Sequence, residues 1–140
     1  MARTVHVPVM LQGGPASLLF VAADATNGDS VVMRAGLMLI ARNTDGAASH
    51  HLTVHSFPDP FDREGNVEHD IPASGAIVTQ AFPVAGWAQA DRRLWYTADS
   101  VLVEVAAVRL SVPSGELGST LRALNAGRTV FLGPRQIVRF

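Results

Sequence analysis

The chain has 140 residues and a formal net charge of −1, which gives no support to nucleic-acid binding because that function usually requires a basic surface. Hydrophobic residues make up 48% and charged residues 16%, which argues against disorder and leaves more apolar side chains than one small domain easily hides. The absence of cysteine excludes disulfides and thiolate metal sites, and no apolar run approaches the roughly 18 residues of a membrane helix. We therefore expect one globular domain that is made in a cytosol and associates with other subunits.

The N-terminal residues have the pattern of a strand. Residues 4–9 alternate with period two, and Pro8 cannot donate a hydrogen bond to a neighbouring strand, so we expect an edge strand or an arm. The first six residues lack the continuous apolar core of a secretory signal and fit the start of this strand. Three valines would share one face and are interface candidates: Val5, Val7 and Val9.

Further strands are predicted over the apolar runs 18–22, 31–34, 37–41 and 50–56. A turn at Asn27-Gly28 follows the first run, because this dipeptide tolerates positive φ. The run at 37–41 is apolar on both faces, which is typical of a central strand. Asp45-Gly46 lies between this run and the next, so we expect a hairpin with a longer loop than the tightest hairpins have.

The second half of the domain begins with residues 57–70, whose two prolines and one glycine predict a long loop. Strands are then predicted at 77–82, 94–97 and 101–110. The last is the longest and is apolar on both faces except at Glu104, which indicates a buried central strand. We favour a structural ion pair for Glu104 over a role as a general base. Its candidate partners are Arg34, Arg42 and Arg109.

The residue pattern changes at Pro113-Ser114-Gly115, where the predicted strands of the sandwich end and a tail begins. Leucines at positions 117, 121 and 124 predict a short amphipathic helix, and residues 128–132 and 136–140 read as two strands. The segment 113–140 holds four arginines and one glutamate, whereas residues 59–70 hold five acidic side chains and one arginine, so the two segments have opposite charge. We expect the tail to be an assembly arm; the alternative is that it adds strands to its own domain. Its interface candidates are Arg122, Arg128, Phe131, Arg135, Arg139 and Phe140.

These patterns predict an all-β fold. Residues 1–112 would form a single β-sandwich of the jelly-roll or Ig-like type, with the N-terminal edge strand or arm. Residues 113–140 would add the helix and the extra strands.

Histidines and carboxylates in the middle of the chain are the candidate metal ligands. His51 and His55 alternate onto one face of a strand, and Asp59 and Asp62 follow them. A cupin-type site would place two histidines two residues apart and a third near the end, whereas these are four apart and no histidine follows His69. We therefore favour a solvent-facing or interfacial histidine row, with no metal and no cofactor. A metal-dependent enzyme built on His51 and His55 is the remote alternative.

No complete catalytic motif occurs in the sequence. The acidic loop lacks the ligand spacing of a calcium loop, no Gly-x-Ser-x-Gly elbow is present, and the paired glycines lack the context of a phosphate loop. We predict no catalytic residues and no enzymatic activity.

Five segments follow one another along the chain: an Asn-Gly turn at 27–28, a Gly-led apolar strand ending in Asn at 36–43, a Pro-Ala-Ser-Gly segment at 71–75, a Phe-Pro strand end at 81–83 and a final strand ending in Arg-Leu at 105–110. Together these segments resemble features of small tailed-phage virion structural proteins, the head decoration or cement-like β-sandwich family.

The resemblance implies a capsid decoration, or cement, protein on the outer surface of the virion. Its partners would be the major capsid protein and other copies of itself, with a trimer favoured, and neither nucleic acid nor a membrane. It would be made in the cytoplasm of the bacterial host. Binding only the assembled shell stabilises that shell by mass action, and edge strands or arms suit such contacts. A head-fibre, tail or host-recognition module is the alternative.

Overall fold

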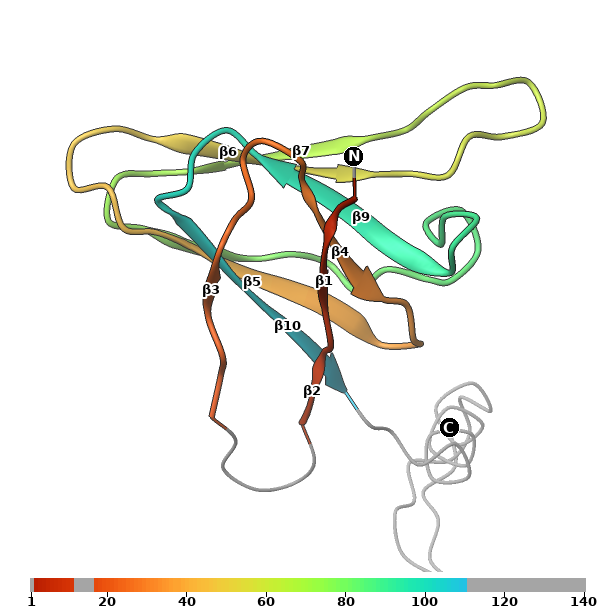
Figure 1. Ribbon diagram of the computed structural model, residues 1–140, viewed down its shortest axis with the longest axis horizontal. Coiled ribbons are helices and arrows are strands. Elements are labelled where there is room, and N and C mark those ends of the chain that lie inside the picture. Colours follow the sequence, from red (N-terminus) through yellow and green to blue (C-terminus); the bar gives the residue numbers. More distant parts are fainter. Residues whose placement is uncertain (1, 12–16, 111–140) are drawn as a thin grey trace, which may run out of the picture. The chain divides into compact units, whose positions relative to one another are not determined.

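The computed structural model describes residues 2–11 and 17–110 and places strands but no helix among them (Figure 1). None of these residues belongs to a helix that is long and apolar enough to cross a membrane. The strands are β1 (Thr4–His6), β2 (Val9–Leu11), β3 (Val21–Ala22), β4 (Asp29–Val32), β5 (Leu37–Asn43), β6 (His50–His55), β7 (Val67–Ile71), β8 (Ala76–Val78), β9 (Arg93–Ala98) and β10 (Val103–Leu110).

Two sheets pack into a β-sandwich, as the sequence predicts. One has the order β1-β4-β9-β6-β7, and the other has the order β2-β10-β5-β8 with β3 also paired to β10. From β3 onward the antiparallel pairs are nested, because β3 pairs with β10, β4 with β9, β5 with β8 and β6 with β7. β5 also pairs with β10, and β6 also pairs with β9, which joins these strands into the two sheets. This rolled-up hairpin is the topology of a jelly roll, the first of the two expected types.

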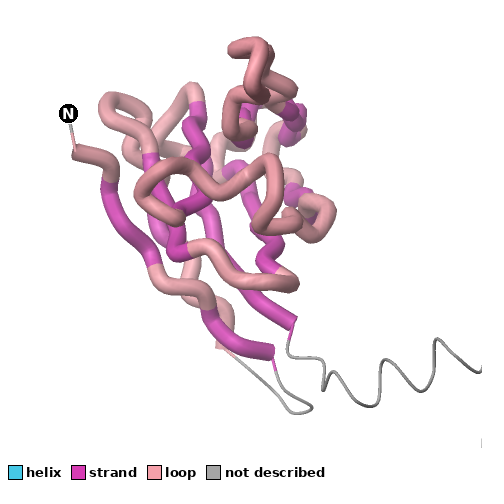
Figure 2. The backbone as a smooth tube through the Cα atoms, turned by 90° about the vertical axis from the view of Figure 1, so that its right-hand side faces the viewer, coloured by secondary structure: helices cyan, strands magenta, loops and turns pink. Residues whose placement is uncertain are grey.

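The N-terminal strand is divided at Pro8. β1 runs parallel to β4 at the edge of one sheet, and β2 runs parallel to β10 in the other. Figure 2 shows these two strands following each other along one margin of the sandwich. The predicted edge position is confirmed. The same strands also complete the chain's own sheets, so they are not a free arm in this structure.

Two predicted connections are wrong. Asp45-Gly46 does not close a hairpin, because β5 and β6 belong to different sheets and the loop crosses between them. Residues 57–70 are not all loop, because Val67–Ile71 forms β7 on the edge beside β6. Acidic and histidine side chains interrupt that strand, so its apolar alternation is weak. The turn at Asn27-Gly28 is present, and Gly28 adopts a φ of 76°.

The core lies between the sheets and contains the side chains that the alternation predicts. Leu39, Val54, Val103 and Val105 are all buried. β10 lies inside its sheet, between β5 on one side and β2 and β3 on the other. Glu104 forms an ion pair with Arg42, whose Nε lies 2.6 Å from Oε2. The central strand and the structural role of Glu104 are confirmed.

The predicted helix and strands of the tail lie outside the described residues. The same holds for the interface candidates Arg122, Arg128, Phe131, Arg135, Arg139 and Phe140. The last described strand, β10, ends at Leu110, close to the predicted end of the sandwich domain at residue 112.

Candidate functional site

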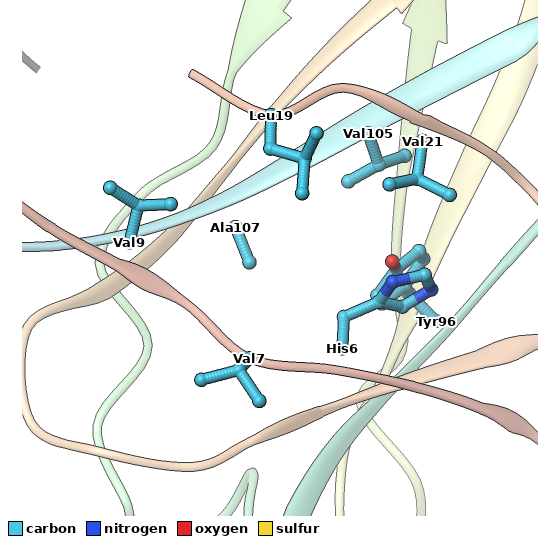
Figure 3. A pocket seen from close by; sticks show the side chains of 8 residues that line it. All are labelled: His6, Val7, Val9, Leu19, Val21, Tyr96, Val105 and Ala107. Atoms are coloured by element: carbon cyan, nitrogen blue, oxygen red, sulfur yellow. The ribbon is translucent and has the colours of Figure 1, made fainter. Parts of the chain in front are cut away.

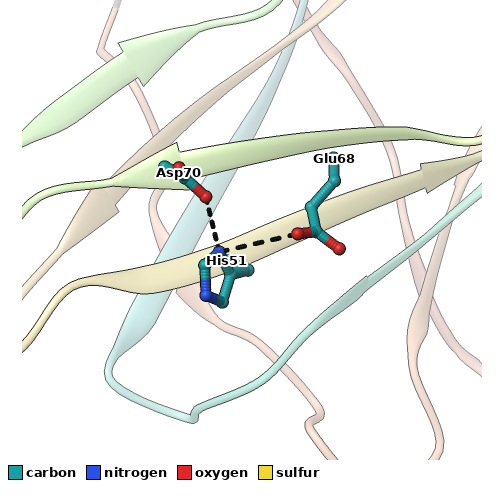
Figure 4. A group of neighbouring side chains, drawn as sticks. All are labelled: His51, Glu68 and Asp70. Carbon is teal, nitrogen blue, oxygen red and sulfur yellow. Dashed lines mark hydrogen bonds and ion pairs between the residues drawn. The ribbon is translucent and has the colours of Figure 1, made fainter.

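The outer face of β6 and β7 holds a histidine between two carboxylates. The antiparallel register places His51 opposite Asp70, and Glu68 lies two residues along β7 on the same face, opposite Thr53. The Nδ1 atom of His51 lies 2.6 Å from an Asp70 oxygen and 3.8 Å from a Glu68 oxygen (Figure 4). This is the only group of potential metal ligands that residues 2–11 and 17–110 bring together, and all three side chains are exposed.

His51 and His55 do not share a site, although they lie on one strand. The Nε2 atom of His55 is 3.0 Å from the hydroxyl oxygen of Thr97. Burial, reinforced by the charge of Arg3, lowers the pKa of His55. The hydrogen bond that His51 donates to Asp70 raises the pKa of His51, against a smaller opposing effect of desolvation. His51 therefore keeps its proton to a higher pH than His55 does.

The acidic members of the predicted set lie elsewhere. Asp59 pairs with Arg63, whose nitrogen atoms lie 2.7 Å from its Oδ2, and this hydrogen bond lowers the pKa of Asp59. Asp62 lies in the same loop with a φ of 60°. The structure therefore does not bring together the four weak metal candidates, His51, His55, Asp59 and Asp62; Glu68 and Asp70 lie beside His51 instead. Glu68 and Asp70 are two residues apart and so share one face of β7, but the weak apolar alternation of residues 67–71 gave little sign of that strand in the sequence.

The His51 group has the chemistry of a surface ion pair. Its three ligand atoms lie within 4.8 Å of one another, so a divalent cation there would have to replace the proton that His51 shares with Asp70. His50, the residue before His51, also lies between two carboxylates: its Nε2 is 3.1 Å from Asp45 and its Nδ1 is 3.1 Å from Asp99. That histidine joins two loops at one end of the sandwich, which is a structural role.

A small apolar pocket lies where the N-terminal segment passes from one sheet to the other. β2 pairs with β10 at residues 108–110 and β3 pairs with it at 104–105, so the described strands leave Ala106 and Ala107 without a partner on that edge. The pocket has a volume of about 50 Å³, far below the roughly 300 Å³ of the smallest ordinary ligand sites. Its lining is His6, Val7, Val9, Leu19, Val21, Tyr96, Val105 and Ala107 (Figure 3).

Polar contacts beneath this pocket hold the N-terminal segment in place. The Nε2 atom of His6 is 2.8 Å from Oδ1 of Asp29, which is fully buried. The other oxygen of Asp29 accepts a hydrogen bond of 2.8 Å from the backbone N–H of Asp24. Burial, with a smaller effect of the Asp29 charge, raises the pKa of Tyr96 beside them. These contacts give β1 a defined position on the sandwich.

Exposed apolar side chains gather along the same margin. We define the N-terminal margin as residues 2–11 and 17–22. Val7 is 76% exposed and Leu19 is 68% exposed, and both line the mouth of the small pocket. Of the predicted interface valines, Val5 is also exposed, whereas Val9 is half-buried in the pocket wall. Leu19 was not among the predicted interface residues; it lies in the apolar run 18–22, which was predicted only as a strand.

No protein-family model, curated protein or solved structure matches this chain.

Proposed function

We propose that the protein is a non-enzymatic virion structural protein, a capsid decoration or cement protein that binds the outside of a phage head and stabilises its subunit seams. The observation that carries this proposal is the N-terminal margin, where Val5, Val7 and Leu19 expose apolar surface beside an incompletely paired edge of β10. Apolar side chains grouped at the edge of a sheet suit contact with another protein, and an edge can accept a neighbouring strand.

The rest of the sandwich supports a scaffold role. The space between the sheets is filled by leucine, valine and tyrosine side chains, and His51 and His55 on β6 lie on the outer face of their sheet. The remote alternative, a metal-dependent enzyme, requires His51 and His55 to bind one metal ion, and these two side chains do not share a site. Jelly rolls occur in viral capsid and lectin domains, which is an analogy at the level of fold alone. The partners we propose are the major capsid protein and further copies of this chain, with a trimer favoured.

The test is binding to phage heads that lack this protein, prepared from the phage that encodes it. The wild-type chain should sediment with the heads and raise the temperature at which they disrupt. Val7→Asp and Leu19→Asp should each weaken binding at least tenfold while the thermal unfolding of the isolated protein changes little. Val78→Asp is the matched control, because Val78 is 63% exposed on β8, at the other edge of the same sheet. Wild-type binding by both margin variants would contradict the proposal.

A second candidate function is a head-fibre, tail or host-recognition module. The observation that favours it is the loop between β6 and β7, where Phe57 and Phe61 are both exposed. Copy number separates the two functions, since a decoration protein covers the whole shell and a fibre or tail component occupies a few positions. Quantitative gel analysis of purified particles measures that number.

A further inference from the structure

A hollow lies at the end of the sandwich where β4 leads into β5 and where β9 begins. Its volume is about 420 Å³, within the range of ordinary ligand sites. It is lined by Met33, Arg34, Ala35, Val84, Ala88 and Arg92, and we call it the arginine hollow.

The arginine hollow combines an apolar floor with positive charge. Arg34 donates to the Met33 carbonyl at 3.1 Å, and Arg109 donates to the Ala35 carbonyl at 3.0 Å beside the hollow. Within residues 2–11 and 17–110, no carboxylate lies within ion-pair distance of Arg34, Arg92 or Arg109. The neighbouring Asp91 carboxylate is held by the backbone N–H of Arg93 and by Trp95 Nε1, each at 3.1 Å. The hollow is thus suited to an apolar side chain accompanied by acidic groups.

The β6–β7 loop, residues 56–66, has that composition. Asp59 organises its tip by accepting hydrogen bonds from the backbone N–H groups of Phe61 and Arg63 at 2.8 and 3.0 Å. Phe61 is 77% exposed, and Arg63 covers one face of its ring at 5.1 Å from the centroid. Three acidic residues and one arginine give residues 57–66 a balance of −2. An ordered loop loses less conformational freedom on binding than a mobile one.

The loop and the arginine hollow lie at the same end of the sandwich. The backbone N–H of Phe57 donates to the Gly86 carbonyl at 2.8 Å, and residue 86 lies between two residues of the hollow lining, Val84 and Ala88. Figure 1 shows the β6–β7 loop extending beyond the sheets on the side where the β8–β9 loop turns. The high exposure of Phe61 shows that it does not fill the hollow of its own chain.

We propose that the β6–β7 loop of one copy enters the arginine hollow of a second copy, with Phe61 against the apolar floor and Asp62 facing Arg34 and Arg92. Complementary charge identifies the second copy as the occupant, because the loop carries the sign opposite to that of the hollow. Each copy carries both the β6–β7 loop and the arginine hollow at one end. The same contact can therefore form twice in a closed dimer or repeat around a ring. The contact deepens the self-association in the proposed function and does not depend on binding to a shell.

The test is the mass of the full-length protein in solution, measured by sedimentation over a wide concentration range at low and high salt. We expect the mass to rise with concentration, and less so at high salt, because the contact is partly ionic. Phe61→Ser should weaken self-association at least tenfold. Val78→Ser is the matched control, since it removes an exposed apolar side chain from β8 and should leave the mass unchanged.

A charge exchange identifies the partners. Arg92→Asp and Asp62→Arg should each weaken association, and the double variant should recover it because the pair is restored with reversed sign. Arg92 and Asp62 have φ values of 61° and 60°; aspartate tolerates this conformation better than most residues and arginine already adopts it at position 92, so both single variants should remain folded. A wild-type protein that stays monomeric, association that survives Phe61→Ser, or no recovery in the double variant would each overturn the contact. Binding of heads by these variants is measured separately, so its loss or retention bears on the proposed function alone.

Discussion

Replacing Asn43 with alanine tests how the two sheets are joined at the end of β5. Asn43 is 3% exposed. Its side-chain nitrogen donates to the carbonyl oxygens of Ala48, Ile71 and Pro72 at 2.8, 3.2 and 3.2 Å. Its side-chain oxygen accepts from the backbone N–H of Asp45 at 2.9 Å. One side chain on β5 therefore connects the β5–β6 crossover with the end of β7, which belongs to the other sheet.

The expected loss follows from this set of hydrogen bonds. The amide has two donor protons for three carbonyls, so the side chain contributes about three effective hydrogen bonds, counting the one it accepts. A net value of about 0.5–1.5 kcal/mol for each bond gives a loss of about 1.5–4.5 kcal/mol in the free energy of unfolding, because alanine leaves buried carbonyl oxygens without a partner. Urea unfolding followed by tryptophan fluorescence measures this quantity.

Asn66→Ala is the matched control. Asn66 is exposed, and its oxygen accepts a single backbone hydrogen bond of 2.9 Å from Ser56. Its loss should therefore be about 0.5–1.5 kcal/mol. If Asn43→Ala costs no more than Asn66→Ala, the connection between the sheets does not depend on Asn43 and the reasoning is refuted.

Four further predictions follow from the core, the histidines and the tail. Leu39→Ala should cost about 2–5 kcal/mol in denaturant unfolding, because Leu39 is fully buried on β5, and a loss below about half a kcal/mol would make the strand peripheral. His51 and His55 should titrate on opposite sides of the ordinary value of 6.5 in an NMR titration, and Asp70→Asn should return the pKa of His51 towards that value. The stabilisation of the folded state by His51 is complete below pH 6.5 and is lost as the pH rises through the raised pKa of His51. The stabilisation by neutral His55 is complete above pH 6.5 and is lost as the pH falls through the lowered pKa of His55. Elemental analysis after dialysis should find zinc, iron and manganese well below stoichiometric amounts, whereas a retained equivalent would restore the metal hypothesis. Deleting residues 113–140 should leave a folded protein that coats heads less completely, because we expect the tail to bind the shell beside the N-terminal margin; unfolding would mean that the tail belongs to the core, and full coating would show that the N-terminal margin is sufficient for attachment.

The separate strands and much of the core could be read from the sequence. Alternating and continuous apolar runs at 37–41, 50–56 and 101–110 correspond to β5, β6 and β10. The buried positions of Leu39, Val54 and Val103 follow from the same pattern. Such properties are local, because side chains on a strand point to alternate faces and apolar ones avoid water. The edge position of Pro8 follows equally from its missing N–H group.

Only the tertiary structure decided which strands are neighbours. The backbone groups of a strand can pair with any other strand, so Asp45-Gly46 reads as a hairpin even though β5 and β6 belong to different sheets. The register between β6 and β7 brings Glu68 and Asp70 to His51, and the nested pairing from β3 to β10 makes the fold a jelly roll. Register and sheet order depend on packing the whole core at once, through contacts between residues far apart in the chain, and no short window of the sequence contains them.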